Sequence, residues 1–339
     1  MPNVPEVYPL SLSSPPPIGE TTHEQTVAAV GEFGVIAGVT AGRSQPAATL
    51  LGPGDDAAVV AAPDGRVVVS TDVLVDGVHF RLDWSTADQV GRKAAAANLA
   101  DIAAMGAVPT ALLVGLACPP ETPTHVVSGL ADGLWAEAGA VGVGLVGGDL
   151  TAAPAMVVSV TALGSLEGRV PVTRAGARPG DRLALCGRIG WSAAGLAVLA
   201  RGFRSPVAVV GAHRVPEPPY AAGPQAARAG ATAMIDVSDG LLADLGHVAR
   251  ASGVLMDLDT GRLLVPQRLV EVGAALGVEP LHWLLTGGED HALAATFPPD
   301  AVLPEGWTVI GSVEAGDPGV LVDGRVYSGG PAGWDHFAR

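Results

Sequence analysis

The chain has 339 residues, of which 34 are Asp or Glu and 19 are Lys or Arg, and its formal net charge is −15. This length predicts two domains, because a single domain usually holds about 100–200 residues. The negative charge excludes nucleic acid as a partner, since nucleic-acid binders need clustered Lys and Arg. Lys93 is the only lysine and has no glycine pair at the spacing of a phosphate-binding loop, which excludes that class of nucleotide site.

Further features indicate a cytoplasmic location. No apolar run reaches the roughly 20 residues that a helix needs to cross a bilayer, so we expect no membrane partner. Residues 1–19 are rich in Pro and lack the basic and apolar regions of a signal peptide, which predicts a disordered tail. Cys118 and Cys186, the only cysteines, lie in apolar strand-like runs, where a buried free thiol is the usual outcome. A reducing compartment fits this pattern.

Helix-like and strand-like segments alternate along the chain, which predicts an α/β (α+β) fold. Thr21 with Glu24 and Thr86 with Gln89 have the spacing of a capping box and begin two helices, and Gly106 ends the second. The predicted helices cover 21–39, 86–105, 123–138, 192–201 and 239–251, and the predicted strands cover 57–61, 66–72, 108–117, 141–146, 156–163, 182–186, 232–237 and 254–258.

One segment has the composition of a domain junction. Residues 167–181 are rich in Gly, Arg and Pro, which is typical of a connection between domains. We therefore predict an N-terminal domain over 20–166 and a C-terminal domain over 167–339.

Carboxylates recur at predicted strand and helix ends. Taken alone, each is more often a helix cap or a turn residue. Asp101 differs, because a carboxylate in an Ala-rich helix costs desolvation energy unless paired, and no basic residue lies three or four positions away. The groups in chain order are Gly54-Asp55-Asp56 before a strand, Ser70-Thr71-Asp72 at the end of one, Asn98 with Asp101 on one helix face, Gly148-Asp149 at a strand end, and Asp236-Val237-Ser238-Asp239-Gly240 between a strand and a helix.

These carboxylates predict a magnesium site. Strand ends gather at one edge of the sheet in α/β domains, and ligands bind there. Converging carboxylates repel one another unless cations neutralise them. Hard oxygen ligands without a Cys or His cluster select magnesium over zinc. A site with several magnesium ions is suited to in-line phosphoryl transfer.

A glycine pattern that resembles a dinucleotide fingerprint is rejected. Gly142, Gly144 and Gly147 have the G-x-G-x-x-G spacing. They lie within or at the end of an apolar strand and lead to Gly148-Asp149, whereas the fingerprint requires a strand, a turn and then a helix.

The motifs taken together resemble thiamine-monophosphate kinase. The resemblance covers about 31–337, and its specificity comes from many weak motifs in one order. His291 departs from the pattern, because the family usually has Tyr there. The motifs are Gly31-Glu32-Phe33, Gly54-Asp55-Asp56-Ala57, Ser70-Thr71-Asp72, Gly77-Val78-His79-Phe80, Asn98 to Gly106, Gly147-Gly148-Asp149, Thr173-Arg174-Ala175-Gly176, Asp236 to Leu241, and Gly287-Gly288-Glu289-Asp290.

The resemblance implies a fold, a reaction and a set of site residues. The fold is the two-domain fold of aminoimidazole ribonucleotide synthetase, with N-terminal domains that pair through their sheets in a homodimer. The reaction is ATP-dependent phosphorylation of thiamine phosphate to thiamine diphosphate. The implied magnesium ligands are Asp56, Ser70, Thr71, Asp72, Asp101, Asp149, Asp236 and Asp239; the implied ATP contacts are Gly148, Asp149, Arg174 and Ser238; and the implied thiamine phosphate contacts are His79, Glu289 and Trp334.

Each implied role is chemically sound. Arg174 can clamp phosphate oxygens, Glu289 can accept hydrogen bonds from an aminopyrimidine, and Trp334 can stack on a ring. Without the family context, a lone His or a C-terminal Trp more often serves packing. The acceptor phosphate is already ionised near neutral pH, so we expect no protein nucleophile and no obligatory general base.

Two alternatives stay open. Within the same fold, a selenophosphate synthetase needs a reactive Cys or selenocysteine near the N-terminus and a HypE-like protein needs a C-terminal Cys. Cys118 and Cys186 supply neither. From another class, the chain is a nucleotide-binding regulator without turnover, although it retains every implied metal ligand.

Overall fold

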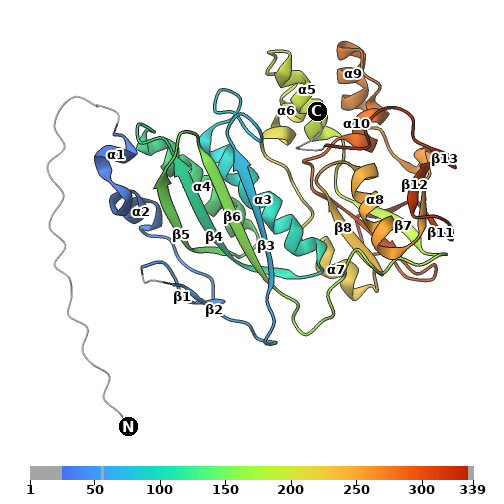
Figure 1. Ribbon diagram of the computed structural model, residues 1–339, viewed down its shortest axis with the longest axis horizontal. Helices are drawn as coiled ribbons and strands as arrows, with labels where there is room; N and C mark the ends of the chain where they lie inside the picture. Colours follow the sequence, from blue (N-terminus) through green and yellow to red (C-terminus); the bar gives the residue numbers. More distant parts are fainter. Residues whose placement is uncertain (1–24, 55–56, 335–339) are drawn as a thin grey trace, which may run out of the picture.

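The computed structural model describes residues 25–54 and 57–334 (Figure 1). Two β-sheets lie along the long axis of the molecule, and helix α3 (Ala87–Ala104) packs between them, against β3, β4 and β6 on one side and β8 and β10 on the other. The predicted tail over 1–19, the predicted cap of Thr21 with Glu24, and Asp56 lie outside the described residues.

The N-terminal domain has a four-stranded sheet in the order β3-β6-β4-β5. β6 pairs antiparallel with β3 and β4, whereas β4 and β5 are parallel. β1 and β2 form a separate two-stranded sheet. The elements are α1 (Val27–Val30), α2 (Glu32–Thr40), β1 (Thr49–Leu51), β2 (Val59–Val60), β3 (Val68–Val75), α3, β4 (Val108–Cys118), α4 (Thr124–Ala140), β5 (Gly144–Ala152) and β6 (Val157–Ser165).

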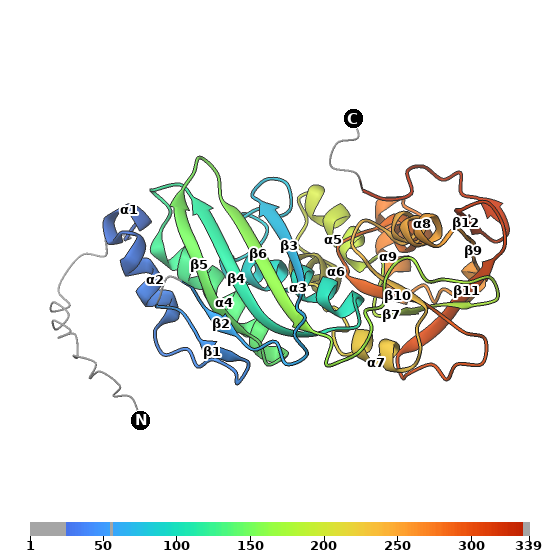
Figure 2. The same cartoon turned by 60° about the horizontal axis from the view of Figure 1, so that its bottom comes forward.

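One face of this sheet is covered by α3 and α4 (Figure 2). Val158, Val160 and Ala162 of β6 are buried against the helices, as expected from the alternation of side chains along a strand. α3 and α4 approach each other closely, because a Cβ at Gly91 would lie 2.0 Å from the Leu130 carbonyl oxygen. Glycine at that position lets the helix backbones touch.

The C-terminal domain has a seven-stranded sheet in the order β13-β12-β9-β11-β7-β10-β8, antiparallel except for β12 with β9. Its elements are β7 (Arg182–Cys186), α5 (Trp191–Ala200), α6 (Val207–Arg214), α7 (Ala222–Arg228), β8 (Ala233–Val237), α8 (Leu241–Ser252), β9 (Leu255–Leu258), the 3-10 helix η1 (Thr260–Arg262), α9 (Gln267–Leu276), α10 (Pro280–Thr286), β10 (Ala292–Phe297), β11 (Trp307–Glu314), β12 (Gly319–Val322) and β13 (Arg325–Val326).

Strand β8 connects the core of the C-terminal domain to α3. Ala233, Ile235 and Val237 pack into the core that holds α5, α8 and α10. Met234 belongs instead to a smaller core that includes the end of α3. Because side chains alternate along a strand, Asp236 lies on the same face as Met234. The sequence of β8 therefore directs one carboxylate toward the N-terminal domain.

Several predicted elements are confirmed and three need correction. The Thr86 capping box and the strand over 182–186 are as predicted. The helix predicted over 21–39 is divided among the described residues by Gly31, whose φ is 77°. β3 and β5 do not end at the acidic motifs, because pairing continues to Val75 with Val157 and to Cys118 with Ala152. The prediction that these two motifs stand at strand ends is therefore wrong.

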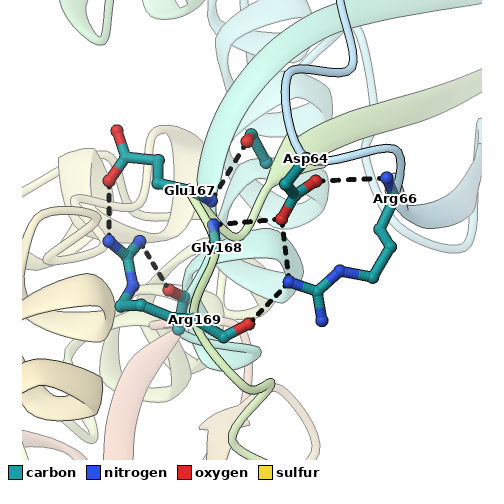
Figure 3. Close-up of polar contacts among 7 residues, drawn as sticks. Asp64, Arg66, Glu167, Gly168 and Arg169 are labelled. Carbon is teal, nitrogen blue, oxygen red and sulfur yellow. Dashed lines mark hydrogen bonds and ion pairs between the residues drawn. The ribbon is translucent and has the colours of Figure 1, made fainter.

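The connection between the two sheets is held against the turn that precedes β3 (Figure 3). The backbone N–H of Gly168 donates to Asp64 Oδ2 at 3.0 Å, and Arg66 donates to the carbonyl oxygen of Arg169 at 3.0 Å. Arg169 also donates to the Gly106 carbonyl oxygen at 3.2 Å. These contacts fix the start of β3 relative to the end of α3. The predicted domain boundary at 166/167 falls in this connection and remains our proposal.

Candidate functional site

The acidic residues of β3 and α3 face each other inside the N-terminal domain. Ser70 Oγ donates to Asp101 Oδ2 at 2.6 Å. The backbone N–H of Asp72 donates to Asn98 Oδ1 at 3.0 Å, and β3 makes this contact with its unpaired edge. Asp72 and Ser70 point to the helix side because they alternate with the exposed Thr71. The i,i+3 spacing of Asn98 and Asp101 thus places an amide and a carboxylate beside the strand.

Asp236 of the C-terminal domain adds a third carboxylate to this group. Burial, together with the charges of Asp236 and Asp72, raises the pKa of Asp101 to about 7. Burial also raises the pKa of Asp72, and Asp236 and Asp239 raise it further. Like charges act on one another only when they lie close and poorly screened. Of the carboxylates predicted to hold magnesium, Asp72, Asp101 and Asp236 therefore lie close together, between the domains and not at one sheet edge.

The loop after β8 is held by a residue of helix α8. Asp244 Oδ2 accepts hydrogen bonds from the backbone N–H groups of Asp239 and Gly240, both at 3.0 Å. Burial and the charge of Asp236 raise the pKa of Asp244 to about 7. The backbone N–H of Trp334 donates to the Asp239 carbonyl oxygen at 2.9 Å. The C-terminal segment therefore lies against the predicted metal and ATP loop.

Four predicted site residues are not drawn into this group. Thr71 Oγ1 bonds the Val160 carbonyl oxygen on the outer face of the sheet. Gly148 and Asp149 are exposed on β5, at the sheet edge opposite β3. Arg174 is exposed, and its carbonyl oxygen accepts a hydrogen bond from Ser252 near the end of α8. A cavity of about 650 Å³ at the domain connection is lined by none of the predicted site residues.

Two of the three residues predicted to contact the acceptor share one lysine. Lys93 Nζ donates to Glu289 Oε2 at 2.9 Å and to the His79 carbonyl oxygen at 3.0 Å. Burial alone would raise the pKa of Glu289, but the charge and hydrogen bond of Lys93, together with His213 and His291, outweigh it and hold the pKa at about 2. His79 Nδ1 accepts from the backbone N–H of Val75 at 3.0 Å. The His79 ring therefore has a fixed orientation, with its proton on Nε2 when neutral.

A serine and a histidine beside Glu289 do not form a nucleophilic relay. Ser192 Oγ lies 3.0 Å and Glu289 Oε2 lies 3.5 Å from the same atom, His213 Nδ1. A relay needs the two groups on opposite ring nitrogens, so that one proton passes through the ring. Burial and the charge of Lys93 lower the pKa of His213 to about 3, so the ring is neutral. The geometry supports the expectation of no protein nucleophile.

His291, the departure from the family pattern, bonds a predicted metal ligand. Its Nδ1 lies 3.0 Å from Asp236 Oδ2, and both side chains are buried. Burial lowers the pKa of His291, but Asp236, together with Glu289 and Asp101, outweighs this and raises it above its ordinary value. His291 and Glu289 both have positive φ angles, 54° and 62°, which non-glycine residues rarely adopt. The loop is thus held in a strained form beside the site.

The carboxylate oxygens between the domains are of the type that binds a hard cation, although they do not lie close enough together to coordinate one. Among residues 25–54 and 57–334, no three His, Cys, Asp or Glu side chains lie close enough together to hold a metal ion. The convergent donors are nevertheless carboxylate oxygens whose pKa values are raised by burial and by mutual repulsion. Hard divalent cations prefer such oxygen ligands. The chemistry of the group therefore fits magnesium.

Comparison with known proteins assigns the chain to a family. Residues 54–166 match the family described as AIR synthase related protein, N-terminal domain. Thiamine-monophosphate kinase of Mycobacterium tuberculosis (strain ATCC 25618 / H37Rv) is 54% identical over 319 residues, which are 94% of this chain and 95% of that protein. The kinase of the same name from Corynebacterium glutamicum is 43% identical over 90% of both chains. The chain belongs to the thiamine-monophosphate kinase family.

Solved structures agree with this membership. The structure of AaThiL complexed with AMPPCP and TMP superposes with a TM-score of 0.76 at 30% identity, covering 93% of this chain and 100% of that one. Hydrogenase maturation protein HypE superposes with a TM-score of 0.64 at 18% identity, which shows a common fold alone. The predicted two-domain, aminoimidazole ribonucleotide synthetase-like fold is confirmed. No helix in the described part of the chain is long and apolar enough to cross a bilayer.

Three residues that contact the predicted site residues of this thiamine-monophosphate kinase family member were not predicted from the sequence. They are Lys93, His213 and Asp244, which are all buried. The apolar pattern of a helix predicts that a lysine or an aspartate within it is buried, and a buried charge needs a partner. This pattern could therefore have identified Lys93 and Asp244 from the sequence. The identity of each partner was not available from the sequence, because Lys93 and Glu289 are 196 positions apart.

Proposed function

We propose that this chain transfers the terminal phosphoryl group of ATP to thiamine phosphate and so forms thiamine diphosphate. The main support is 54% identity over 94% of the chain to a thiamine-monophosphate kinase. The site supports the same reaction, since convergent carboxylates lie beside the residues expected to contact the acceptor. The reaction needs two polyanions to meet inside an acidic protein, and cations resolve that conflict.

The roles of the residues follow from their positions. We propose that Ser70, Asp72, Asp101, Asp236 and Asp239 hold magnesium ions between the domains. Bound magnesium would supply the positive charge that neutralises the phosphates during transfer. Asn98 and Asp244 orient the backbone of the ligand-bearing segments through hydrogen bonds of 3.0 Å each. An ionised acceptor phosphate needs orientation more than it needs a base.

The function is tested by ADP release. We expect ADP to form with thiamine phosphate and magnesium, and not with thiamine or without an acceptor. A coupled assay of ADP with the three mixtures measures this directly. Equal ADP release in all three mixtures would contradict the kinase assignment, and no release in any would favour a regulator.

The metal proposal predicts a dependence of stability on pH. The folded-state pKa of Asp101 is about 7 against an ordinary value of 3.8. The folded state therefore binds a proton that the unfolded state has released, so metal-free protein loses stability as pH rises from about 4 to about 7. With EDTA, we expect the melting temperature to fall between about pH 5 and about pH 8, and magnesium to restore it mainly at the higher pH.

The matched control for this experiment is Asp101→Asn, which cannot titrate. Its melting temperature should fall less as pH rises and should rise less on addition of magnesium, while general repulsion changes little because the net charge differs by only one unit. Melting curves that ignore EDTA and magnesium at both pH values would count against a metal site.

We propose further that the N-terminal domains pair through the uncovered face of their sheet. Val69 and Val73 are 59% and 48% exposed on that face. Asp149 is exposed on the opposite edge strand from Asp72. It can therefore serve as a metal ligand only if two copies of the chain pair so that Asp149 of one copy lies beside the Asp72 cluster of the other. A two-fold pairing of identical sheet faces satisfies both observations.

We propose a cytoplasmic location. Cys118 and Cys186 are both free and buried, which suits a reducing compartment. ATP and thiamine phosphate are small-molecule partners that are available there.

A further inference from the structure

The single lysine of the chain is buried at the boundary between the two domains. Lys93 lies in α3 and is 4% exposed. Its Nζ donates to Glu289 Oε2 of the C-terminal domain at 2.9 Å and to the His79 carbonyl oxygen at 3.0 Å. A lysine is almost never buried without a partner, because removing its charge from water is costly. This lysine therefore has a defined task at this position.

Both partners of Lys93 belong to the proposed acceptor end of the site. His79 follows β3, and Glu289 lies in the loop between α10 and β10. The Glu289 side chain is 33% exposed, so a ligand can reach this side chain. One ammonium group thus joins the two segments that would contact the acceptor from opposite domains.

We propose that Lys93 is a positioning residue for the acceptor: it holds the Glu289 carboxylate and the His79 segment in one arrangement across the domain boundary. This inference rests on the proposed function, because it assumes that Glu289 contacts the acceptor. Lys93 itself is turned toward Glu289 and His79, so it acts on the acceptor through them. A carboxylate held in one orientation loses less entropy when it binds a ligand.

The groups around Glu289 give the proposal a pH signature. Lys93 from α3, His213 from α6 and His291 from the same loop face this carboxylate. Lys93 is the main group that favours the charged form, since the His213 ring is neutral and His291 is held by Asp236. Without Lys93, burial raises the pKa of Glu289. The carboxyl group then takes up a proton at a higher pH than in wild type, and once protonated it can no longer accept hydrogen bonds with both oxygens.

The test compares Lys93→Met with wild type by separate titrations of thiamine phosphate and an ATP analogue. We expect the dissociation constant for thiamine phosphate to rise about tenfold to a hundredfold at neutral pH, with ATP analogue binding unchanged. The ratio of the variant's dissociation constant to that of wild type should fall as pH rises. Taking this ratio cancels the titration of the ligand itself. Lys93→Arg, which keeps the charge, should recover part of the affinity.

Two further variants separate positioning from a general structural effect. Tyr220→Phe removes another contact between the domains, the 2.8 Å bond from the Tyr220 hydroxyl to Glu137, and should leave both affinities unchanged. Lys93→Met combined with Glu289→Gln leaves no unpaired buried charge, which protects folding if the single variant fails to fold. This double variant should bind thiamine phosphate only slightly more weakly than Glu289→Gln does, because it also loses the Lys93 bond to the His79 carbonyl oxygen.

The proposal is overturned if Lys93→Met binds thiamine phosphate like wild type, or if both ligands weaken equally and without a change in pH profile. It is also overturned if the double variant binds the acceptor far more weakly than Glu289→Gln alone. Failure of the proposed function has a different signature, because wild type itself would then show no ADP release that depends on thiamine phosphate.

Discussion

Asp72→Asn should lower turnover by about a hundredfold or more without unfolding the protein, because a charge that holds magnesium against the developing phosphoryl charge is lost. The fold should survive, since the backbone N–H of Asp72, and not its carboxylate, bonds Asn98. Neutralising one member of a repelling group should even raise the melting temperature of the metal-free protein. Steady-state assays across magnesium concentrations, with melting curves of the same samples, measure both effects.

The matched control is Asp300→Asn, which removes an exposed carboxylate from the loop after β10. It makes the same chemical change far from the cluster of Asp72, Asp101 and Asp236, and it should leave turnover unchanged. A well-folded Asp72→Asn variant with near-wild-type turnover at limiting magnesium would show that Asp72 is not a metal ligand.

Asp149→Asn should give a loss of the same size for a different spatial reason. Asp149 lies at the far edge of its own sheet from Asp72, so we expect it to complete the site of a second copy. Asp72→Asn and Asp149→Asn chains that are mixed and allowed to exchange should then regain activity. In a mixed dimer one site carries both changes and the other carries neither, so random pairing restores about a quarter of wild-type activity.

The mixing experiment has a clear opposite outcome. If each site is built from one chain, every site in every mixed dimer carries one change and activity stays at the level of the single variants. That result, for dimers shown to have exchanged, would exclude the role of the partner copy proposed for Asp149.

Local signals in the sequence predicted local structure well. The Thr86 and Gln89 spacing predicts the start of α3 because both hydrogen bonds of a capping box form within one turn. The ends of β3 and β5 were missed because cross-strand pairing determines where a strand stops, and the pairing partners β6 and β4 are distant in sequence. Strand propensity alone carries no such information.

For the candidate site, too, some features could be predicted from the sequence and others could not. The chemical types of its residues could be predicted, since hard oxygen donors and a resemblance to one family both pointed to phosphoryl transfer. The placement could not, because Asp101 meets Asp236 only through the packing of α3 against β8. Asp149 shows the limit most clearly, since its motif gives no sign that the strand would carry it to the opposite sheet edge.

Trp334→Ala should weaken thiamine phosphate binding and leave ATP binding nearly unchanged. Trp334 is 61% exposed, and its backbone N–H bonds the Asp239 carbonyl oxygen. Alanine keeps that backbone bond, so the substitution removes only the indole. The loss of a stacked ring costs about 1–3 kcal/mol, which means a roughly five- to 150-fold rise in the acceptor's dissociation constant.

Trp334 would recognise the ring system of thiamine phosphate, which lies away from its phosphate. The cluster of aspartates and its bound ions would act on the phosphates alone. Thiamine without its phosphate should therefore not be phosphorylated, because its hydroxyl would lie one phosphate short of the transfer position and would need a base. Phe203→Ala, which removes another exposed ring, is the control for losing an aromatic side chain. If Trp334→Ala weakens ATP as much as thiamine phosphate, or if thiamine proves the better acceptor, Trp334 does not select the acceptor and the substrate assignment fails even if the chain is a kinase.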